Sequence, residues 1–354
     1  MEQRFLGKSG LSVSALSFGT MTVGGRERFR NMGNIGVEEA SRMIDICLES
    51  GVNFIDTADL YSFGAAEEVL GEALAGRRQQ VLIGTKAFMR MGPGAHDIGL
   101  SRKHLIEACE DSLGRLRTDY VDLYMAHDPD SLVPAEETMR AFDDLVRDGK
   151  VRYIGCCNYS GWHVMKGLAV SERNGFTRYI SQQIHYSLLC RDIEHEMVPM
   201  GLDQGVGVMA WSPLHYGLLS GKFRRDARPT ETRLNQLEAP GVIDQERLYR
   251  IVDELVAISG QRGVTPAQIA LNWVMSKPGI STVIIGARNE AQLRDNLGAA
   301  QFQLSSEEMA RLDEVSATPE PYPYWHQHKF GAERNPRLPS MREMAPVAKA
   351  VKIT

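Results

Sequence analysis

The sequence predicts a (β/α)8 or TIM barrel, an α/β fold in which eight parallel strands close into a barrel and a helix follows each strand. Strand-like runs alternate with amphipathic stretches along most of the 354 residues, without a break in composition. The strand candidates are mostly apolar throughout, as expected when both faces of a parallel sheet are buried. We therefore expect one domain over residues 1–354, with its barrel at about 15–300.

Eight strand-then-helix units follow one another in order. The strands are expected at residues 15–20, 53–58, 81–86, 120–127, 153–158, 180–185, 207–212 and 282–286. The helices are expected at 37–50, 65–75, 101–116, 134–148, 162–173, 194–204, 244–260 and 290–300, with an additional helix at 265–277. This alternation favours a barrel. A doubly wound open sheet is the alternative, but the run at 19–25 after the first strand lacks that fold's glycine fingerprint.

Three segments fall outside the repeat. Residues 1–14, with a turn at 7–10, are typical of a hairpin before the first barrel strand. Residues 217–243 form a long basic insertion that contains Pro229 and Pro240. A proline-rich tail occupies about 317–354. A tail of this kind either is exposed or faces another subunit, or folds over the active face, and its aromatic and histidine cluster at 322–328 favours the second option.

Composition narrows the class of protein. A formal charge of -5 argues against a nucleic-acid partner. The odd count of five cysteines, with no C-x-x-C pair, is typical of reduced thiols in a cytosolic protein. No apolar run is long enough for a membrane span, and the first residues lack the apolar core of a signal peptide. A cytoplasmic protein is therefore expected, either a monomer or a homo-oligomer.

Ionisable side chains end three successive strand candidates, and they are the strongest functional signal in the chain. Asp56 and Lys86 end the second and third strands, and His127 ends the fourth. Tyr61 lies on the short loop after Asp56. Because catalytic groups gather at the carboxyl ends of barrel strands, these four residues are the expected catalytic cluster.

This cluster suits the reduction of a carbonyl group, because negative charge develops on the carbonyl oxygen and an acid must protonate it. A free tyrosine has a pKa of about 10 and is a weak acid at pH 7. Lys86, oriented by Asp56, can lower the pKa of Tyr61, because an ammonium favours the phenolate. His127 can hydrogen-bond the same oxygen.

Each residue also has an interpretation that involves no chemistry. Asp56 could cap a helix, Lys86 could be a solvated loop lysine, and His127 could occupy a turn. Tyr61 could be a packing aromatic with a wet hydroxyl. Their joint occurrence at successive strand ends favours catalysis.

The residues around this cluster resemble a known family. The run 51–61, Gly-Val-Asn-Phe-Ile-Asp-Thr-Ala-Asp-Leu-Tyr, with Glu-Glu-Val-Leu-Gly at 67–71, resembles the first signature of the aldo-keto reductases. Lys86 and His127 match the family's remaining catalytic positions, and the resemblance extends from about residue 6 to 313. Within this family, the sequence is most similar to bacterial members whose barrels resemble potassium-channel β subunits and sugar-aldehyde reductases. The resemblance implies NAD(P)H-dependent reduction of aldehydes or ketones, with Tyr61 as the acid.

The resemblance also implies a nucleotide site along the later strands. Asn158 and Gln183 match positions that bind the nicotinamide carboxamide, and Trp211 offers a flat face on which the nicotinamide ring could stack. Gln183 in an apolar strand needs a partner, and a ligand amide is a good one. The expected cofactor-binding residues are Gly19, Thr20, Asp56, Asn158, Gln183, Trp211, Ser212, Pro213, Leu214, Gly217, Leu219, Gly221, Lys222, Gly286, Arg288, Gln292 and Asn296.

Two segments suggest which nucleotide is bound. The loop 217–222 could fold across a pyrophosphate, with Lys222 adding charge. Arg288 precedes a helix on which Gln292 and Asn296 share one face. Helix N-termini favour anions, and the arginine fork suits a phosphate. The combination favours the 2′-phosphate of NADP, with NAD as the alternative.

Two positions depart from the family pattern. Cys157 stands where a serine usually precedes the carboxamide-binding Asn158, and a thiol is the weaker hydrogen-bonding group. His185 stands where many members carry a carboxylate. A neutral structural histidine is favoured there over a second acid–base group.

The substrate pocket is expected beneath the loop 87–100, the residues after Met21 and the tail. The residues expected to contact substrate are Phe88, Met89, Tyr324 and Trp325. An adaptable apolar wall of this kind suits a bulky hydrophobic carbonyl compound, although Arg90 and Arg102 leave a phosphorylated sugar as an alternative.

Two other functions are weighed against an NADPH-dependent reductase. One is a regulatory or sensor subunit that binds NADPH and a partner protein with little turnover. The resemblance to channel β subunits suggests this alternative. The other is a divalent-metal barrel enzyme, but His127-Asp128 is the only close pair near a strand end, so no metal is expected. The expected small-molecule partner is a carbonyl compound.

Overall fold

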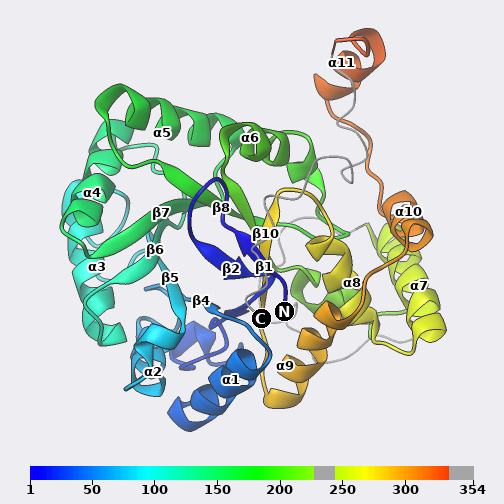
Figure 1. Cartoon of the computed structure of the whole chain (residues 1–354), viewed down its shortest axis with the longest axis horizontal. Coiled ribbons are helices and arrows are strands. Elements are labelled where there is room, and N and C mark those ends of the chain that lie inside the picture. Colours follow the sequence, from blue (N-terminus) through cyan, green and yellow to red (C-terminus); the bar gives the residue numbers. More distant parts are fainter. Residues whose placement is uncertain (227–243, 335–354) are drawn as a thin grey trace.

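The computed structural model describes residues 1–226 and 244–334. Eight parallel strands close into a barrel in the order β10-β3-β4-β5-β6-β7-β8-β9 (Figure 1). Their bounds are β3 Leu16–Gly19, β4 Phe54–Asp56, β5 Leu82–Ala87, β6 Val121–Ala126, β7 Val151–Cys157, β8 Tyr179–His185, β9 Gly207–Trp211 and β10 Ile280–Ile285. The predicted barrel is confirmed, and each of its strands coincides with a strand expected from the sequence.

Helices form a ring around the strands in Figure 1. Those that follow barrel strands are α1 Val37–Glu49, α2 Ala65–Ala73, α3 Arg102–Leu116, α4 Ala135–Arg147, α5 Gly161–Asn174, α6 Met197–Gln204, α7 Gln245–Arg262 and α9 Glu290–Leu297. The additional helix is α8 (Pro266–Met275), which begins with a capping box between Thr265 and Gln268. Trp273 on α8 is fully buried, so this helix belongs to the packed outer layer.

An antiparallel hairpin closes one end of the barrel. Its strands are β1 (Gln3–Phe5) and β2 (Ser12–Ser14), and Figure 1 shows them across the middle of the strands. The Arg4 guanidinium donates to the carbonyls of Met275 and Ile280, over 2.9 and 3.0 Å. Ile280 is the first residue of β10, so the hairpin covers the N-terminal end of the barrel. The predicted hairpin is thereby confirmed.

The inside of the barrel is apolar beneath its C-terminal rim. Side chains from several strands pack there with residues of the hairpin. They are Leu6, Leu11, Val13, Phe54, Leu123, Met125, Cys157, Met209 and Ile284. The hairpin and this layer exclude water from the N-terminal end of the barrel. Polar groups at the C-terminal end therefore lie directly above a packed apolar layer.

The C-terminal part of the chain contains two helices that the sequence interpretation missed. Helix α10 (Ser306–Val315) begins with a capping box in which the Ser305 side chain accepts from the Glu308 backbone N–H. Helix α11 (Tyr324–Phe330) lies outside the ring of barrel helices in Figure 1. The proline-rich tail thus contains a helix, and α11 does not cover the mouth of the barrel, contrary to the expectation that the aromatic cluster folds over the active face. Residues 227–243, with Pro229 and Pro240, and 335–354 lie outside the described residues.

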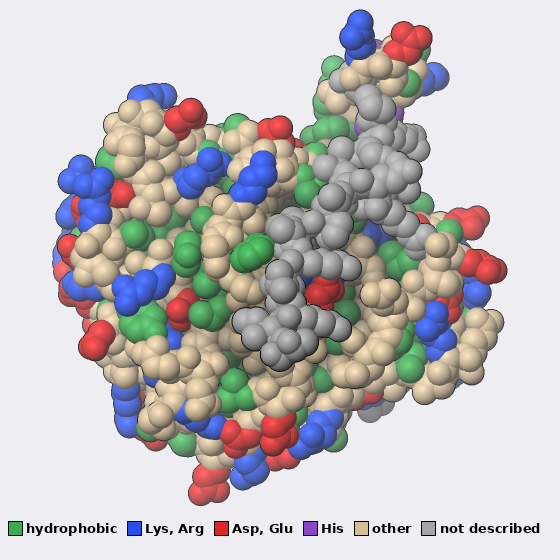
Figure 2. Space-filling view, in the orientation of Figure 1, with side chains coloured by type: hydrophobic (Ala, Val, Ile, Leu, Met, Phe, Trp, Pro, Cys, Tyr) green, Lys and Arg blue, Asp and Glu red, His purple; other side chains and the backbone are tan. Residues whose placement is uncertain are grey.

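The surface carries charges of both signs. Lysine, arginine, aspartate and glutamate side chains are intermixed around the rim of the face shown in Figure 2. Among the described residues, no helix is both long and apolar enough to cross a bilayer.

Candidate active site

A buried ion pair lies at the C-terminal end of the barrel. Asp56 ends β4, and Lys86 comes from the neighbouring β5. The Lys86 ammonium contacts both carboxylate oxygens of Asp56, at 2.8 and 2.9 Å, and donates to the carbonyl of Thr57 over 2.7 Å. Lys86 is 0% and Asp56 2% exposed, so the pair is removed from water. Burial by itself lowers the pKa of Lys86, but the Asp56 carboxylate outweighs this effect, and the pKa lies above its ordinary value.

Gln183 completes this network from the opposite side of the barrel. Its Nε2 donates to Asp56 Oδ1 over 2.8 Å, although the two residues are far apart in the chain. The sequence argument that a buried Gln183 needs a polar partner is correct, but the partner in this structure is Asp56. Gln183 thus holds one carboxylate oxygen while Lys86 holds both, which orients the ion pair.

Tyr61 lies next to Lys86. The lysine Nζ is 5.0 Å from the centroid of the phenol ring. Burial raises the pKa of Tyr61 to about 12, while the nearby ammonium of Lys86 acts in the opposite direction. We expected the ammonium to bring the pKa below its ordinary value. The structure shows that the ammonium does lower the pKa but that burial is the larger effect, so Tyr61 keeps its proton at neutral pH.

His127 follows β6 and joins the same group. Its ring centroid lies 6.0 Å from that of Tyr61, in an edge-to-face arrangement. Burial, and then the charge of Lys86, lowers the pKa of His127 to about 3, so the imidazole is neutral at physiological pH. Within the described residues its buried Nδ1 has no hydrogen-bond partner. The structure therefore brings together all four residues predicted to be catalytic.

A second buried network fixes the loop that carries Tyr61. Glu67 on α2 is fully buried, accepts from the Thr85 hydroxyl on β5, and pairs with Arg115 on α3 over 2.7 Å. The left-handed Gly64 (φ 87°) lies against this arginine, because a Cβ there would come within 2.7 Å of Arg115 Cδ. Any larger residue at position 64 would thus clash with the Arg115 side chain that pairs with Glu67.

Asn158 and Trp211 form a bridge across the rim. Asn158 follows β7 in a left-handed conformation (φ 56°), which asparagine tolerates better than most residues. Its Nδ2 donates to the carbonyl of His127, and its Oδ1 accepts from Trp211 Nε1, both over 3.1 Å. The amide expected to hold a nicotinamide carboxamide is therefore connected to both His127 and Trp211. Behind Asn158, the thiol of Cys157 lies 3.9 Å from Met125 Sδ.

The segment after β9 turns sharply. Ser212 and Gly217 both have left-handed backbones, with φ of 51° and 93°, and Gly217 lies within η4 (His215–Ser220). The Ser212 hydroxyl accepts from the Tyr216 N–H over 3.2 Å, which closes the turn. Among the other residues expected to bind cofactor here, Leu219 is buried in the core and Lys222 is exposed. Only a part of this segment thus faces solvent.

Gly19 and Thr20 lie at the end of β3 and are buried. Thr20 donates from both its N–H and its hydroxyl to the carbonyl of Asp56, over 2.9 and 3.1 Å. These bonds attach the end of β3 to the end of β4. In this structure Thr20 therefore supports the backbone of Asp56.

The end of β10 and the start of α9 form an exposed edge. Gly286 and Arg288 are exposed, and a side chain at Gly286 would meet no atom within 4 Å. Gln292 accepts from the Arg288 N–H over 2.9 Å, and Asn296 donates to the carbonyl of Gly286 over 3.1 Å. The two amides predicted to contact cofactor thus hold this loop in shape, while the Arg288 guanidinium extends from it.

An apolar group borders Tyr61 on the other side. Phe29 on η1 (Glu27–Phe29), Met32 and Leu60 are buried together, and Met89 packs against them. The ring centroids of Phe29 and Tyr61 lie 6.4 Å apart. The region after Met21 was expected to border the substrate pocket, but Phe29 was not foreseen. It lies in a long loop, and nothing in the surrounding sequence distinguishes it. Phe88 packs into the outer core instead.

Tyr324 and Trp325 are not brought to the cluster. Both lie on α11, where Tyr324 stacks on His195, with centroids 5.6 Å apart, and Trp325 contacts Phe330. Prolines precede this helix, which lies outside the ring of barrel helices in Figure 1. Its aromatic side chains pack on one another. The placement gives no support to their predicted contact with substrate.

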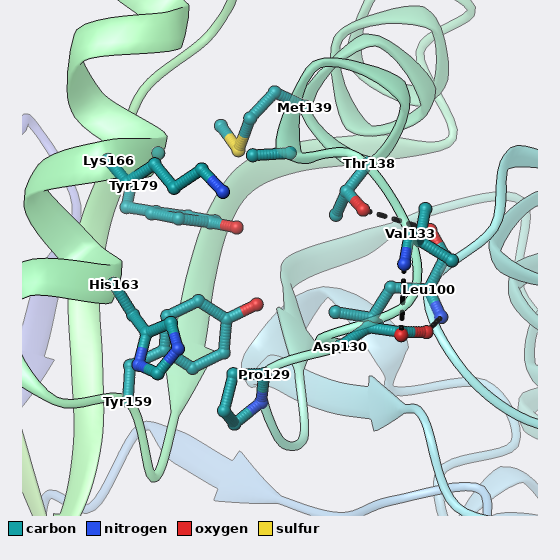
Figure 3. A pocket seen from close by; sticks show the side chains of 12 residues that line it. Leu100, Pro129, Asp130, Val133, Thr138, Met139, Tyr159, His163, Lys166 and Tyr179 are labelled. Atoms are coloured by element: carbon teal, nitrogen blue, oxygen red, sulfur yellow. Dashed lines mark hydrogen bonds between the residues drawn. The ribbon is translucent and has the colours of Figure 1, made fainter.

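A hollow between α4 and α5 is lined by none of the four predicted catalytic residues (Figure 3). Tyr159, Tyr179, His163 and Lys166 line one side of it, and Asp130 borders the other. The Asp130 carboxylate accepts backbone N–H groups from Leu100 and two other residues, so it caps the loop. Among the residues that the structure describes, no group of three or more His, Cys, Asp or Glu side chains is placed to hold a metal ion.

A barrel whose rim holds this tyrosine, lysine, aspartate and histidine corresponds to the family that the sequence suggested. The family model "Aldo/keto reductase family" matches residues 15–317. The chain therefore belongs to the aldo/keto reductase family of oxidoreductases.

Several curated proteins are similar to this chain along most of their length. A "probable voltage-gated potassium channel subunit beta" of Arabidopsis thaliana is 37% identical over 308 residues, which cover 84% of this chain and 91% of the relative. The "uncharacterized oxidoreductase YrpG" of Bacillus subtilis is 35% identical over 340 residues, or 91% of this chain and 99% of the relative. A "putative voltage-gated potassium channel subunit beta" of Schizosaccharomyces pombe is 36% identical over 330 residues, or 88% of this chain and 92% of the relative.

Proposed function

We propose that this protein reduces an aldehyde or ketone to the alcohol with NADPH, reversibly, and that Tyr61 supplies the proton. The observation that carries the proposal is the grouping of Tyr61, a buried Lys86–Asp56 pair and His127 at one end of the barrel. Buried, paired groups with shifted pKa values cluster at functional sites, so this arrangement points to chemistry at the rim.

Each of the four residues has a separate role in the proposed reduction. NADPH, when bound, supplies a hydride to the carbonyl carbon. Tyr61 holds its proton at neutral pH, because its pKa is about 12, and donates it to the developing alkoxide, a far stronger base than tyrosinate. Lys86 stabilises the tyrosinate that remains, and Asp56 holds the ammonium in place. The neutral His127 can hydrogen-bond the carbonyl oxygen and orient it, but it is too weak a base to carry a proton there.

The donor set along the rim fits a nicotinamide nucleotide. The Asn158 amide uses one N–H and one lone pair within the structure and has a second of each to offer a carboxamide, and Trp211 offers an aromatic face. The exposed Arg288 guanidinium next to the open edge at Gly286 suits a phosphate on the ribose. Glu290, whose charge would oppose an anion there, is neutralised by Arg42 at 2.7 Å. These features favour NADP over NAD.

The substrate that suits the pocket is an apolar, bulky carbonyl compound. Phe29 and Met32 belong to an apolar cluster against which both Tyr61 and Met89 pack. Methionines adapt to ligands of different shape, whereas a phosphorylated sugar would need a further cation near Tyr61, because Lys86 is already paired with Asp56. Arg90 instead donates to the carbonyls of Gly92 and Gly94, over 2.9 and 2.8 Å, within its own loop.

Loss of NADPH absorbance in the presence of aromatic and aliphatic aldehydes and ketones tests the reaction. We expect turnover by the parent protein and a loss of at least about 100-fold in kcat for Tyr61→Phe, since general acid catalysis contributes on that scale. Tyr120→Phe is the matched control, because the Tyr120 hydroxyl bonds only to Gln79 at the surface in the described structure. Full activity of Tyr61→Phe would contradict the assignment of the acid.

Arg288→Ala tests the choice of nucleotide. We expect NADPH binding to weaken by roughly tenfold, the worth of about 1.4 kcal/mol for a charge-assisted hydrogen bond, and NADH binding to change little. Arg294→Ala, an exposed arginine on the same helix α9, is the control. Equal weakening of both nucleotides by Arg288→Ala would count against a contact with the 2′-phosphate.

A second function has one specific observation in its favour, because two relatives bear the names of potassium channel β subunits. On this alternative the protein binds NADPH as a regulatory or sensor subunit with little turnover. The same assay separates the two. Tight binding of NADPH by calorimetry, without turnover of any carbonyl compound in the panel, would favour the sensor.

A further inference from the structure

His185 lies in a stack of three aromatic rings at the rim of the barrel. It is the last residue of β8, and its register partner on β9 is Trp211. The imidazole and indole centroids are 4.5 Å apart with an interplanar angle of 16°. On its other side the imidazole stacks on His215, at 4.9 Å and 28°. His185 is thus enclosed between two flat side chains.

The imidazole of His185 makes no polar contact that would explain its presence. Its Nε2 is buried and has no hydrogen-bond partner among the described residues. His215, in contrast, lies within hydrogen-bond distance of the Ser187 hydroxyl, at 3.3 Å. Burial, and then the charge of His215, lowers the pKa of His185 to about 4, so the ring is neutral at physiological pH. The contact that distinguishes His185 is therefore the stacking of its flat ring on the indole of Trp211.

The consequences of this stack extend to the catalytic cluster through hydrogen bonds. The imidazole covers one face of Trp211, so a flat ligand ring can stack only on the opposite face. The edge of the indole is fixed by its bond to Asn158, and the Asn158 amide in turn donates to the carbonyl of His127. Trp211 is therefore held both by a ring behind it and by a hydrogen bond at its edge.

We propose that His185 is a positioning residue of the nicotinamide site, which fixes the plane of Trp211 from behind and thereby keeps the open face of the indole and the Asn158 amide ready for the ligand. The inference rests on the proposed function, because it takes nicotinamide as the ring that Trp211 receives. It assigns to His185 a role that depends on the flatness of its ring and on no proton. A carboxylate at this position could not stack on an indole, so this chain uses another way of holding the ring.

Two substitutions separate shape from chemistry. His185→Leu keeps the apolar volume but removes the flat ring, and we expect NADPH affinity to fall about 2- to 12-fold, the worth of one aromatic pair. His185→Phe keeps a flat ring and removes the unpaired nitrogen, so it should restore the affinity of the parent to within about twofold. Calorimetry measures both. Adenosine 2′,5′-bisphosphate, which lacks the nicotinamide, should bind both variants and the parent equally well.

A double substitution tests whether His185 acts through Trp211. In a Trp211→Leu background, His185→Leu should cause no further loss of NADPH affinity, because the ring that it supports is absent. Three results would overturn the inference: parent-like NADPH binding by His185→Leu, equal losses for His185→Phe and His185→Leu, or equal weakening of NADPH and the bisphosphate. Failure of the parent protein to bind NADPH while it binds other ligands would instead contradict the proposed function.

Discussion

Removal of the Lys86 ammonium should slow the reaction without preventing nucleotide binding. The ammonium lies 5.0 Å from the centroid of the Tyr61 ring. Two opposite unit charges at that separation attract by about 3 kcal/mol at an effective dielectric constant of about 20. Because about 1.4 kcal/mol corresponds to a factor of ten in rate, Lys86→Met should lower kcat roughly 100-fold. The same substitution leaves Asp56 buried without a cation, which costs about 3–5 kcal/mol of stability.

The two effects can be measured separately. NADPH oxidation at saturating substrate gives kcat, calorimetry gives NADPH affinity, and urea unfolding gives stability. Asp56→Asn combined with Lys86→Met should recover most of the lost stability, because neither charge remains, but none of the activity. Lys166→Met, at an exposed lysine on α5, is the control for loss of a lysine. A kcat for folded Lys86→Met within a few-fold of the parent would refute the electrostatic argument.

Two further predictions concern stability and pH. Burial lowers the pKa values of three histidines, to about 3 for His127 and about 4 for His185 and His215, so the unfolded chain binds more protons below pH ~6.5. The free energy of unfolding should therefore fall between pH ~6 and ~4, by roughly 1.4 kcal/mol per pH unit per histidine, and His185→Phe should make this fall shallower in urea titrations. Burial and then the charge of Glu67 raise the pKa of Asp59 well above its usual range, so the folded chain retains a proton that the unfolded chain releases. The stability of Asp59→Asn relative to the parent should rise from pH 5 to 8, whereas no change over this range would show that Asp59 is ionised when buried.

Much of the fold could be predicted because it depends on local pattern. Apolar runs of strand length, separated by amphipathic stretches, identified each barrel strand and the additional helix α8. The sequence also contained a signal for α10 that was not used, namely Ser305 followed three residues later by Glu308, the pattern of a capping box. Helix α11 was harder to foresee, because prolines precede it and its aromatic side chains pack mainly on one another.

The catalytic cluster could be predicted for a related reason. The carboxyl ends of parallel barrel strands meet at one face, so the order of strands along the chain is enough to place Asp56, Lys86 and His127 together. The partner of Gln183 could not be predicted in this way. Its bond to Asp56 crosses the barrel between residues 127 positions apart, and only closure of the sheet brings them within 2.8 Å.

The sequence by itself thus determined the class of fold, the face that carries chemistry and the residue types present on it. The tertiary structure decided how those residues act. It buried Tyr61, which outweighs the effect of the ammonium on the pKa of the phenol, and it placed the ring of His185 flat against Trp211. The physical reason is that periodicity and strand order are properties of neighbouring residues, whereas burial, stacking and hydrogen bonding depend on side chains that meet only when the barrel closes.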